Sequence, residues 1–294
     1  MMSAVSDFCR DWDLPKEAIK SLESAFSVLR EGPGWSVFES SIAVYKENME
    51  FDHMPVFEEI ESLREKTGIH PYTLDLLYLI CLVPLLKQRY LEQHLPLEFF
   101  YDSVSDLKWK AIECKNVYGV WGIFVGWWTI GFFKCRRFGI GRLQFNKRTF
   151  QKSYDVSGIR VREGDLYLDT HIPSGSPLLY EQCRESYRRA AEFFKDDFEN
   201  GTVLFGCRSW LLSPNNRLIL PPSSHILSFM QDYLILEEEQ DEKNGNLWRI
   251  FNTFSMPDDP EKLPQETSLQ RAFVRWLKAG KSIDSAFGVF PWKC

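Results

Sequence analysis

The most regular alternation of apolar and polar residues in the chain is DLYLDTHI at 165–172. Successive side chains of a β-strand point to opposite faces. One face would carry Leu166, Leu168, Thr170 and Ile172, and the other would carry Asp165, Tyr167, Asp169 and His171. This pattern predicts a half-buried strand whose second face is polar.

The residues after this strand predict a loop and then a helix. In PSGSP (173–177), Ser176 is placed to cap a helix, and Pro177 suits its first position, where no N–H is needed. Apolar side chains then recur at helical spacing, at Leu179, Cys183, Tyr187, Ala190, Phe194 and Phe198. With the apolar run at 202–205, the segment predicts a βαβ unit, and ligands of such folds bind beyond the carboxyl ends of the strands.

The N-terminal part of the chain has the apolar period of helices. Residues 16–30, 36–50 and 56–68 each carry an apolar stripe at this spacing. Residues 74–86 are more apolar and predict a central fourth helix, which Pro84 is expected to bend or break.

After Phe138 the apolar period changes to that of strands. Residues 139–145 and 148–154 predict a hairpin that turns at Asn146 and Lys147, and residues 158–161 predict a short strand. The elements expected after the βαβ unit are a helix at 225–230, a strand pair at 233–239 and 247–251, a helix at 268–280 that a Thr267–Gln270 capping box opens, and a last strand at 286–290.

The length of 294 residues predicts two domains, because a chain of this size exceeds a comfortable single core. We expect a helical domain at 1–134 and a mixed domain at 135–294. The uncharged segment 116–133 approaches the length of a membrane span. Because aromatic residues and glycines dominate it, we expect it to be buried at the domain junction and expect no membrane association.

Charge and cysteine content exclude several classes of protein. The net charge of -6 gives no general attraction to nucleic acid. The seven cysteines are odd in number and include no CxxC pair, and the first residues include no apolar signal segment, so a reducing cytoplasm is expected. No His, Cys, Asp or Glu set has metal-ligand spacing, and GxSxG and P-loop motifs are absent. Hydrolase, nucleotidase and metalloenzyme functions therefore lack support.

Three groups of side chains are candidates for chemistry. Asp169 and His171 share a strand face, so the carboxylate is placed to orient an imidazole that accepts a proton; the alternative is an ordinary hydrogen-bonded pair. His225 and Tyr233 are candidate acids, with ring packing as the alternative. Cys207 is a candidate nucleophile but is more typical of a small buried hydrophobe.

Seven basic residues, and no acidic one, lie between Asn116 and Tyr154. They are Lys134, Arg136, Arg137, Arg142, Lys147, Arg148 and Lys152. They suit the phosphates of a cofactor or an acidic partner, or else they protect a hairpin edge from aggregation.

The order of elements resembles the GNAT superfamily of acyl-CoA-dependent N-acyltransferases. More specifically, HIPSG (171–175), CRSWLL (207–212) and LPPSSHIL (220–227) resemble a bacterial family of GNAT-like acyltransferases with an all-helical N-terminal domain. The resemblance covers nearly the whole chain. It implies an α+β architecture in which a mixed, mostly antiparallel sheet with a central βαβ unit follows the helical domain.

The resemblance also implies a reaction and its co-substrate. The pyrophosphate of acyl-CoA, acetyl-CoA or longer, would sit on the helix N-terminus at Ser174, Gly175, Ser176 and Leu178. The backbone of Thr170 and Ile172 would hold the thioester carbonyl. A small-molecule or peptide amine would attack directly, with no metal.

In that reaction His171, with Asp169, would remove the proton of the amine, and Tyr233 would protonate the departing thiolate. Because Pro173 and Pro177 remove two N–H donors from the loop, the alternative is a GNAT-like module without catalysis that binds a ligand or partner.

Overall fold

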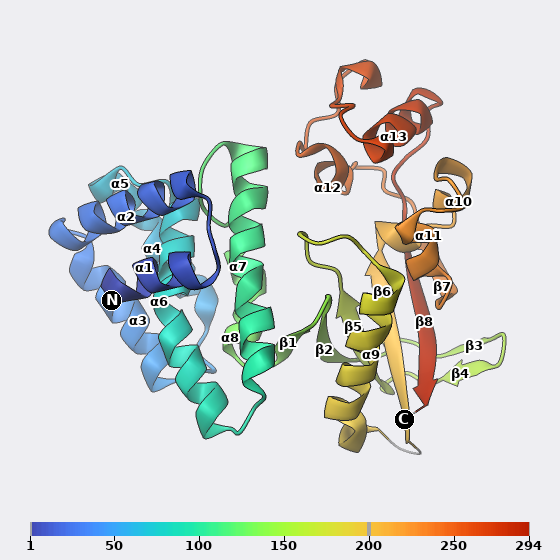
Figure 1. The fold of residues 1–294 in the computed structure, drawn as a ribbon, viewed down its shortest axis with the longest axis horizontal. Helices are drawn as coiled ribbons and strands as arrows, with labels where there is room; N and C mark the ends of the chain where they lie inside the picture. The colour runs from blue at the N-terminus through green and yellow to red at the C-terminus, as the bar shows by residue number, and fades with distance from the viewer. Residues whose placement is uncertain (1, 199–200, 294) are drawn as a thin grey trace. The chain divides into compact units, whose positions relative to one another are not determined.

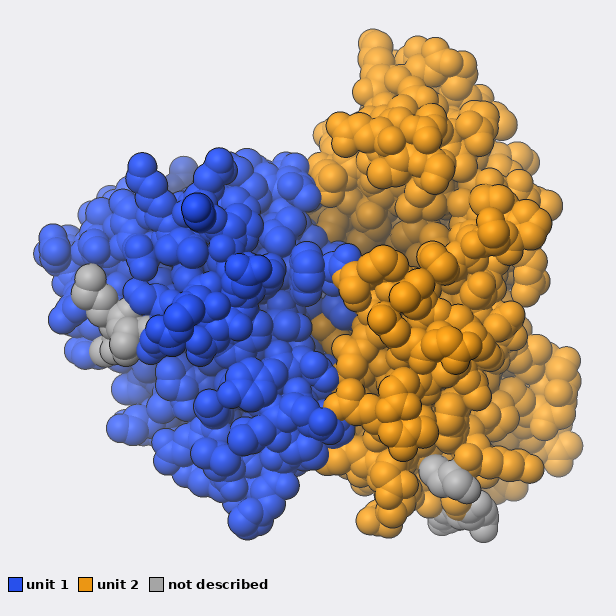
Figure 2. Space-filling model, viewed as in Figure 1, with its two compact units in different colours: residues 1–139, 173–175 blue, residues 140–172, 176–294 orange. Residues whose placement is uncertain are grey.

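The computed structural model describes residues 2–198 and 201–293. The chain divides into two compact units, shown in Figure 2: unit 1 is residues 1–139 with 173–175, and unit 2 is residues 140–172 with 176–294. The loop after the predicted strand at 165–172 therefore clusters with unit 1, although the residues on either side of it belong to unit 2.

Unit 1 is helical. Its helices are α1 (Met2–Asp11), α2 (Lys16–Glu31), α3 (Trp35–Glu47), α4 (His53–Ser62), α5 (Arg64–Thr67), α6 (Pro71–Glu92), α7 (Leu97–Tyr118) and α8 (Gly126–Phe133). The predicted helix at 56–68 is divided into α4 and α5, and it ends at Gly68, whose φ of 70° suits a residue without a Cβ.

The centre of unit 1 is α6, as predicted. Every side chain from Leu74 to Leu82 is buried, and the helix packs against α1, α3, α4, α7 and α8. The helix continues past Pro84, so the predicted break is absent.

The segment at 116–133 forms the end of α7, a loop and α8. Within it Ile130, Phe132 and Phe133 are buried, whereas Trp127 is 55% exposed. None of the described helices combines the length and the apolar character that a membrane crossing needs.

Unit 2 is built on a mixed sheet with the strand order β1-β2-β5-β6-β8-β7. The strands are β1 (Arg137–Ile140), β2 (Leu143–Thr149), β5 (Leu166–His171), β6 (Thr202–Ser209), β7 (Leu234–Glu239) and β8 (Ser285–Lys293). β5 and β6 are parallel, and the β2–β5, β6–β8 and β7–β8 pairs are antiparallel. Helix α9 (Tyr180–Phe194) joins β5 to β6, which confirms the predicted βαβ unit and the mixed, mostly antiparallel sheet.

Both faces of this sheet are covered. On one face α9 covers the sheet and runs along the strands (Figure 1), and its Tyr187 ring packs against Phe145, Phe205 and Phe290. On the other face Phe150, Tyr167, Phe287 and Val289 form a cluster with residues of the small sheet of β3 (Tyr154–Val156) and β4 (Ile159–Val161). The prediction of a half-buried strand was therefore wrong: Tyr167 and Asp169 on the second face are buried, and so are Leu168 and Thr170 on the first.

Two hairpins predicted from the sequence, at 139–154 and at 233–251, are not formed as predicted. β2 runs through Asn146 and Lys147, and the turn before it lies at Gly141, where φ is 64°. Residues 247–251 form the helix α12 (Leu247–Phe251) and not a strand. The Asp241 carboxylate accepts hydrogen bonds from the N–H groups of Gly245 and Asn246, which favours a turn into a helix over a hairpin.

Several predicted elements in the C-terminal part of unit 2 are confirmed. Helix α11 (His225–Met230), strands β7 and β8, and the Thr267–Gln270 capping box of α13 (Ser268–Lys278) are all present. The chain also forms η1 (Lys195–Asp197), η3 (Trp210–Leu212), α10 (Asn216–Ile219) and η4 (Pro260–Lys262). Apolar side chains of α12 and α13 form a second core cluster around Phe251, Phe273 and Leu277.

Candidate active site

Strand β5 stops pairing with β6 before either strand ends. With β2, β5 pairs along its whole length, from Leu166 to His171. With β6 its described register partners are only Leu168 with Phe205 and Asp169 with Gly206, although β6 continues to Ser209 and pairs there with β8. Backbone polar groups need partners when they are buried. The end of β5, where the described pairs with β6 stop, is therefore the candidate place for a ligand in this sheet.

The His171 imidazole lies close to Asn146 and Asp169. Its Nε2 lies 2.8 Å from Asn146 Oδ1 and 3.5 Å from Asp169 Oδ2. An amide oxygen only accepts, so the contact with Asn146 places the proton of a neutral imidazole on Nε2 and its lone pair on Nδ1. The structure thus brings Asp169 and His171 together, but the shorter hydrogen bond is to Asn146.

Asp169 also contacts a cation. Its side chain is 6% exposed, and its Oδ2 lies 3.3 Å from Nη1 of Arg148 on β2. Because Asn146 is directly opposite Asp169 in the β2–β5 register, the two side chains share a face. Sequence reasoning missed Asn146 because it placed this residue in a turn, and only the strand register reveals its role.

Tyr233 lies on the other face of the sheet, beside α9. Its hydroxyl is 2.7 Å from the hydroxyl of Tyr187, and its ring packs against Phe290. Burial raises the pKa of both phenols well above the ordinary value, while Tyr187 and Thr170 lower that of Tyr233. The Thr170 hydroxyl lies near the Tyr233 hydroxyl and lowers its pKa. It makes no hydrogen bond to the described residues. His171 and Asp169 therefore face away from Tyr233, which remains a protonated donor at neutral pH.

The predicted cap of α9 was wrong. The helix begins at Tyr180, its N-cap residue is Leu179, and no side chain caps it. Tertiary contacts override the local signal: Ser174 donates a hydrogen bond to Glu113 of α7, and Arg142 Nε donates to the carbonyl oxygen of Pro177 at 3.2 Å. Ser176 and Leu178 consequently lie in the loop and not on the helix.

The free N–H groups of α9 lie further along the chain than predicted. The first intrahelical bond runs from Cys183 N–H to the Leu179 carbonyl. The amides of Tyr180, Glu181 and Gln182 precede it and point out of the helix end, where an anion is favoured. The N-terminal amides of α9 are thus those of its first turn at 180–182, whereas the sequence predicted that the helix would begin within 174–178.

The other candidates do not converge on this place. Cys207 on β6 is fully buried, and burial raises the pKa of its thiol well above the ordinary value, so it is not a thiolate nucleophile. His225 opens α11. The basic run is divided between the units and engaged there: Lys134 donates to the Phe51 carbonyl oxygen, and Lys147 pairs with Asp197.

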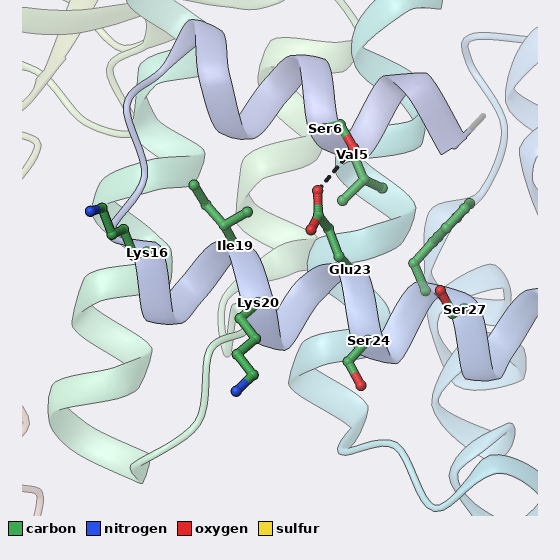
Figure 3. Close-up of a pocket in the computed structure, with 9 residues that line it drawn as sticks. Val5, Ser6, Lys16, Ile19, Lys20, Glu23, Ser24 and Ser27 are labelled. Carbon is green, nitrogen blue, oxygen red and sulfur yellow. Dashed lines mark hydrogen bonds between the residues drawn. The ribbon is translucent and has the colours of Figure 1, made fainter.

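Two hollows in the surface lie elsewhere. One, of about 540 Å³, lies between α1 and α2 (Figure 3) and is lined by Ser6, Lys16, Lys20 and Glu23, with Ser6 hydrogen-bonded to Glu23. The other, of about 580 Å³, is lined by Glu238, Trp276 and Asp284 among others. No predicted catalytic or cofactor-binding residue lines either hollow.

The described residues contain no group of three or more His, Cys, Asp or Glu side chains arranged to hold a metal ion. Cys9, Cys81, Cys114, Cys135, Cys183 and Cys207 are free thiols. Cys294, which the sequence analysis counted with them, lies outside the described residues.

Comparison with known families agrees with this architecture. Residues 138–290 match the GNAT-like C-terminal domain, and residues 3–135 match the N-acyltransferase N-terminal domain. The chain therefore belongs to the family of N-acyltransferases that combine these two domains. No curated protein matches the sequence.

Solved structures share the fold. One is an acyltransferase in complex with decanoyl-CoA and teicoplanin, with a TM-score of 0.77 and 22% identity over 98% of this chain and 87% of that one. Another is a mutant acyltransferase in complex with octanoyl-CoA, with a TM-score of 0.75 and 21% identity over 97% of this chain and 87% of that one. At these identities the likeness shows a common fold.

Proposed function

We propose that the chain transfers an acyl group from acyl-CoA to an amine. The observation that carries the proposal is the end of the described β5–β6 pairing at Asp169, so that the two strands separate at the end of β5 that leads toward α9. A thioester carbonyl can accept an N–H there, and the orphan amides of the first turn of α9 suit the pyrophosphate.

In the proposed step the lone pair of the amine attacks the thioester carbonyl carbon. The C–N bond of an amide forms, the C–S bond breaks, and the electron pair leaves with the CoA sulfur. The amine loses one proton, and the thiolate gains one. The protein has to position the two reactants, accept the first proton and supply the second.

We assign the first proton to His171 Nδ1. The hydrogen bond to Asn146 holds the proton of Nε2, and the Asp169 carboxylate stabilises the imidazolium that forms. Tyr233 is proposed to donate the second proton, because burial keeps its phenol protonated. A thioester between two separated strands is open to both sheet faces, so a base on one face and an acid on the other are compatible with one reaction centre.

The substrates are proposed as classes. Proteins that share the fold have been solved with octanoyl-CoA, decanoyl-CoA and teicoplanin. For this chain we propose acetyl-CoA or a longer acyl-CoA as donor, with Thr170, Ile172, Ser174, Gly175, Ser176 and Leu178 beside it. The acceptor is a small-molecule or peptide amine, and the free thiols favour a reducing cytoplasm.

The second candidate is a GNAT-like module that binds acyl-CoA or another ligand without transfer. Pro173 and Pro177 favour it, because neither supplies an N–H to the loop, and because Ser174 is already engaged with Glu113. It predicts binding without release of free thiol.

Titration calorimetry with acetyl-, octanoyl- and decanoyl-CoA tests the first proposal. We expect saturable binding of at least one donor with a stoichiometry near one. No heat and no thermal shift with any donor, at concentrations near a millimolar, would contradict acyl-CoA binding.

A further inference from the structure

Helix α7 buries two opposite charges. Lys110 and Glu113 are 5% and 8% exposed, and Lys110 Nζ lies 2.9 Å from Glu113 Oε2. Charged side chains are seldom buried this fully, because each loses its hydration. The Lys110 ammonium also lies 5.7 Å from the centre of the Trp128 ring, which adds a cation–π contact.

The second oxygen of Glu113 binds the loop that follows β5. Glu113 Oε1 accepts a hydrogen bond from Ser174 Oγ. The neighbouring Gly175 has a φ of 119°, and a Cβ at that position would lie 2.4 Å from Cε2 of Trp109 on α7. Only glycine fits this close approach. Two consecutive residues of 173–175 are thus held by α7, which explains why this loop clusters with unit 1.

We propose that Glu113 and Lys110 are positioning residues that hold the loop 173–175 in the conformation that receives acyl-CoA. This inference rests on the proposed function, because the same loop belongs to the proposed donor site. Fixing the backbone of a loop residue costs conformational entropy, and a loop that is ordered before binding does not incur that cost when acyl-CoA binds.

The Lys110 charge has a separate effect. A lone carboxylate beside this loop would repel the phosphates of CoA, whereas the buried ammonium compensates the Glu113 charge. Both members of the pair are therefore needed: Glu113 for the hydrogen bond to Ser174, and Lys110 for the charge balance. The helical domain contributes to donor affinity through this pair.

The test uses the double variant Lys110→Met/Glu113→Leu, together with Glu113→Gln. Replacing a buried ion pair by apolar side chains of similar volume is often neutral for stability, so the double variant removes the anchor while the fold is kept. Glu113→Gln keeps an accepting oxygen but removes the charge. The matched control is Ser6→Ala, which removes a Ser–Glu hydrogen bond of 3.0 Å between α1 and α2 of the same unit.

Two measurements are made on the full chain. Hydrogen–deuterium exchange of the peptide 172–179 without ligand is expected to be about tenfold faster in the double variant, since a hydrogen bond to a charged group is lost. Calorimetry is expected to show about tenfold weaker binding of decanoyl-CoA, with Glu113→Gln between the double variant and the wild type. Ser6→Ala is expected to change neither quantity.

Unchanged hydrogen–deuterium exchange in the double variant would contradict the proposal that Glu113 and Lys110 hold the loop 173–175. Faster exchange with donor affinity within twofold of the wild type would overturn its role in binding. If the wild type binds no acyl-CoA, the proposed function fails, and the exchange result alone still decides whether Glu113 holds the loop.

Discussion

At the scale of single residues, the site depends on the hydrogen bond that His171 donates to Asn146. This contact of 2.8 Å fixes which imidazole nitrogen carries the proton, and Asp169 at 3.5 Å supplies the negative charge. Asp169 and His171 could be paired from their spacing on one strand, whereas Asn146 could not, because its position depends on a strand register that no local pattern encodes.

The first prediction concerns His171 itself. His171→Asn keeps a polar side chain but cannot take up a proton near neutrality, so kcat is expected to fall by about 10²–10⁴-fold while the Kd for acyl-CoA stays nearly unchanged. Steady-state rates with the best acceptor of an amine panel, combined with calorimetry, measure the two effects.

The control for this variant is His94→Asn. His94 is exposed in unit 1 and has a φ of 54°, a conformation that asparagine tolerates well. Its turnover should match the wild type. Equal turnover in the His171 variant, or loss of its fold, would assign His171 to a structural role.

The second prediction concerns Cys207. Because burial keeps its thiol protonated at neutral pH, Cys207→Ala should retain kcat within about twofold and lose about 1 kcal/mol of unfolding free energy to the small cavity. Chemical denaturation and rate measurements on the same preparation check both parts. A loss of kcat greater than 100-fold with intact donor binding would instead indicate a covalent intermediate on Cys207.

At the scale of elements, the sequence predicted types better than boundaries. The stripe of Cys183, Tyr187, Ala190 and Phe194 made α9 predictable, and all four residues are buried. The start of α9 was not predictable from Ser176 and Pro177. The loop that contains them is held outside the helix by hydrogen bonds to Glu113 of α7 and to Arg142. The segment 247–251 is also difficult to predict, because five residues are too few for the spacing of apolar side chains to distinguish a strand from a helix. The turn that Asp241 stabilises favours the helix.

The central helix α6 carries a third prediction through Asp75. This side chain is 4% exposed, and its Oδ1 has no hydrogen-bond partner among the described residues. Burial and the neighbouring Glu61 raise the pKa of Asp75 to about 9. Between about pH 4 and 9 the unfolded chain releases a proton that the folded chain keeps, so this residue makes stability fall as pH rises.

Asp75→Asn should remove that dependence. We expect its unfolding free energy at pH 8 to exceed that of the wild type by about 1–3 kcal/mol, and the difference to shrink toward pH 5. Thermal unfolding at a series of pH values measures it. Asp155→Asn, an exposed aspartate of β3, should follow the wild-type profile. If the stability of Asp75→Asn changed with pH in the same way as that of the wild type, Asp75 would not be the protonated carboxyl group inferred here.

At the scale of the whole molecule, the change of apolar period near Phe138 marks the passage from helical to mixed architecture. The boundary expected after Lys134 remains a proposal, close to the start of the GNAT-like match at residue 138. What the period could not reveal is that residues 173–175 cluster with the helical unit, because the contact of Ser174 with Glu113 joins positions 61 residues apart in sequence.

The most direct test of the whole account is the release of free CoA from decanoyl-CoA, followed with a thiol reagent in the presence and absence of an amine panel that includes teicoplanin. The account predicts release that depends on one of the amines, equals the loss of that amine mole for mole, and falls by about 10²–10⁴-fold in His171→Asn. CoA release at a rate that does not depend on the amine would contradict N-acyl transfer. Binding of decanoyl-CoA without release of CoA in the presence of any acceptor would contradict it as well.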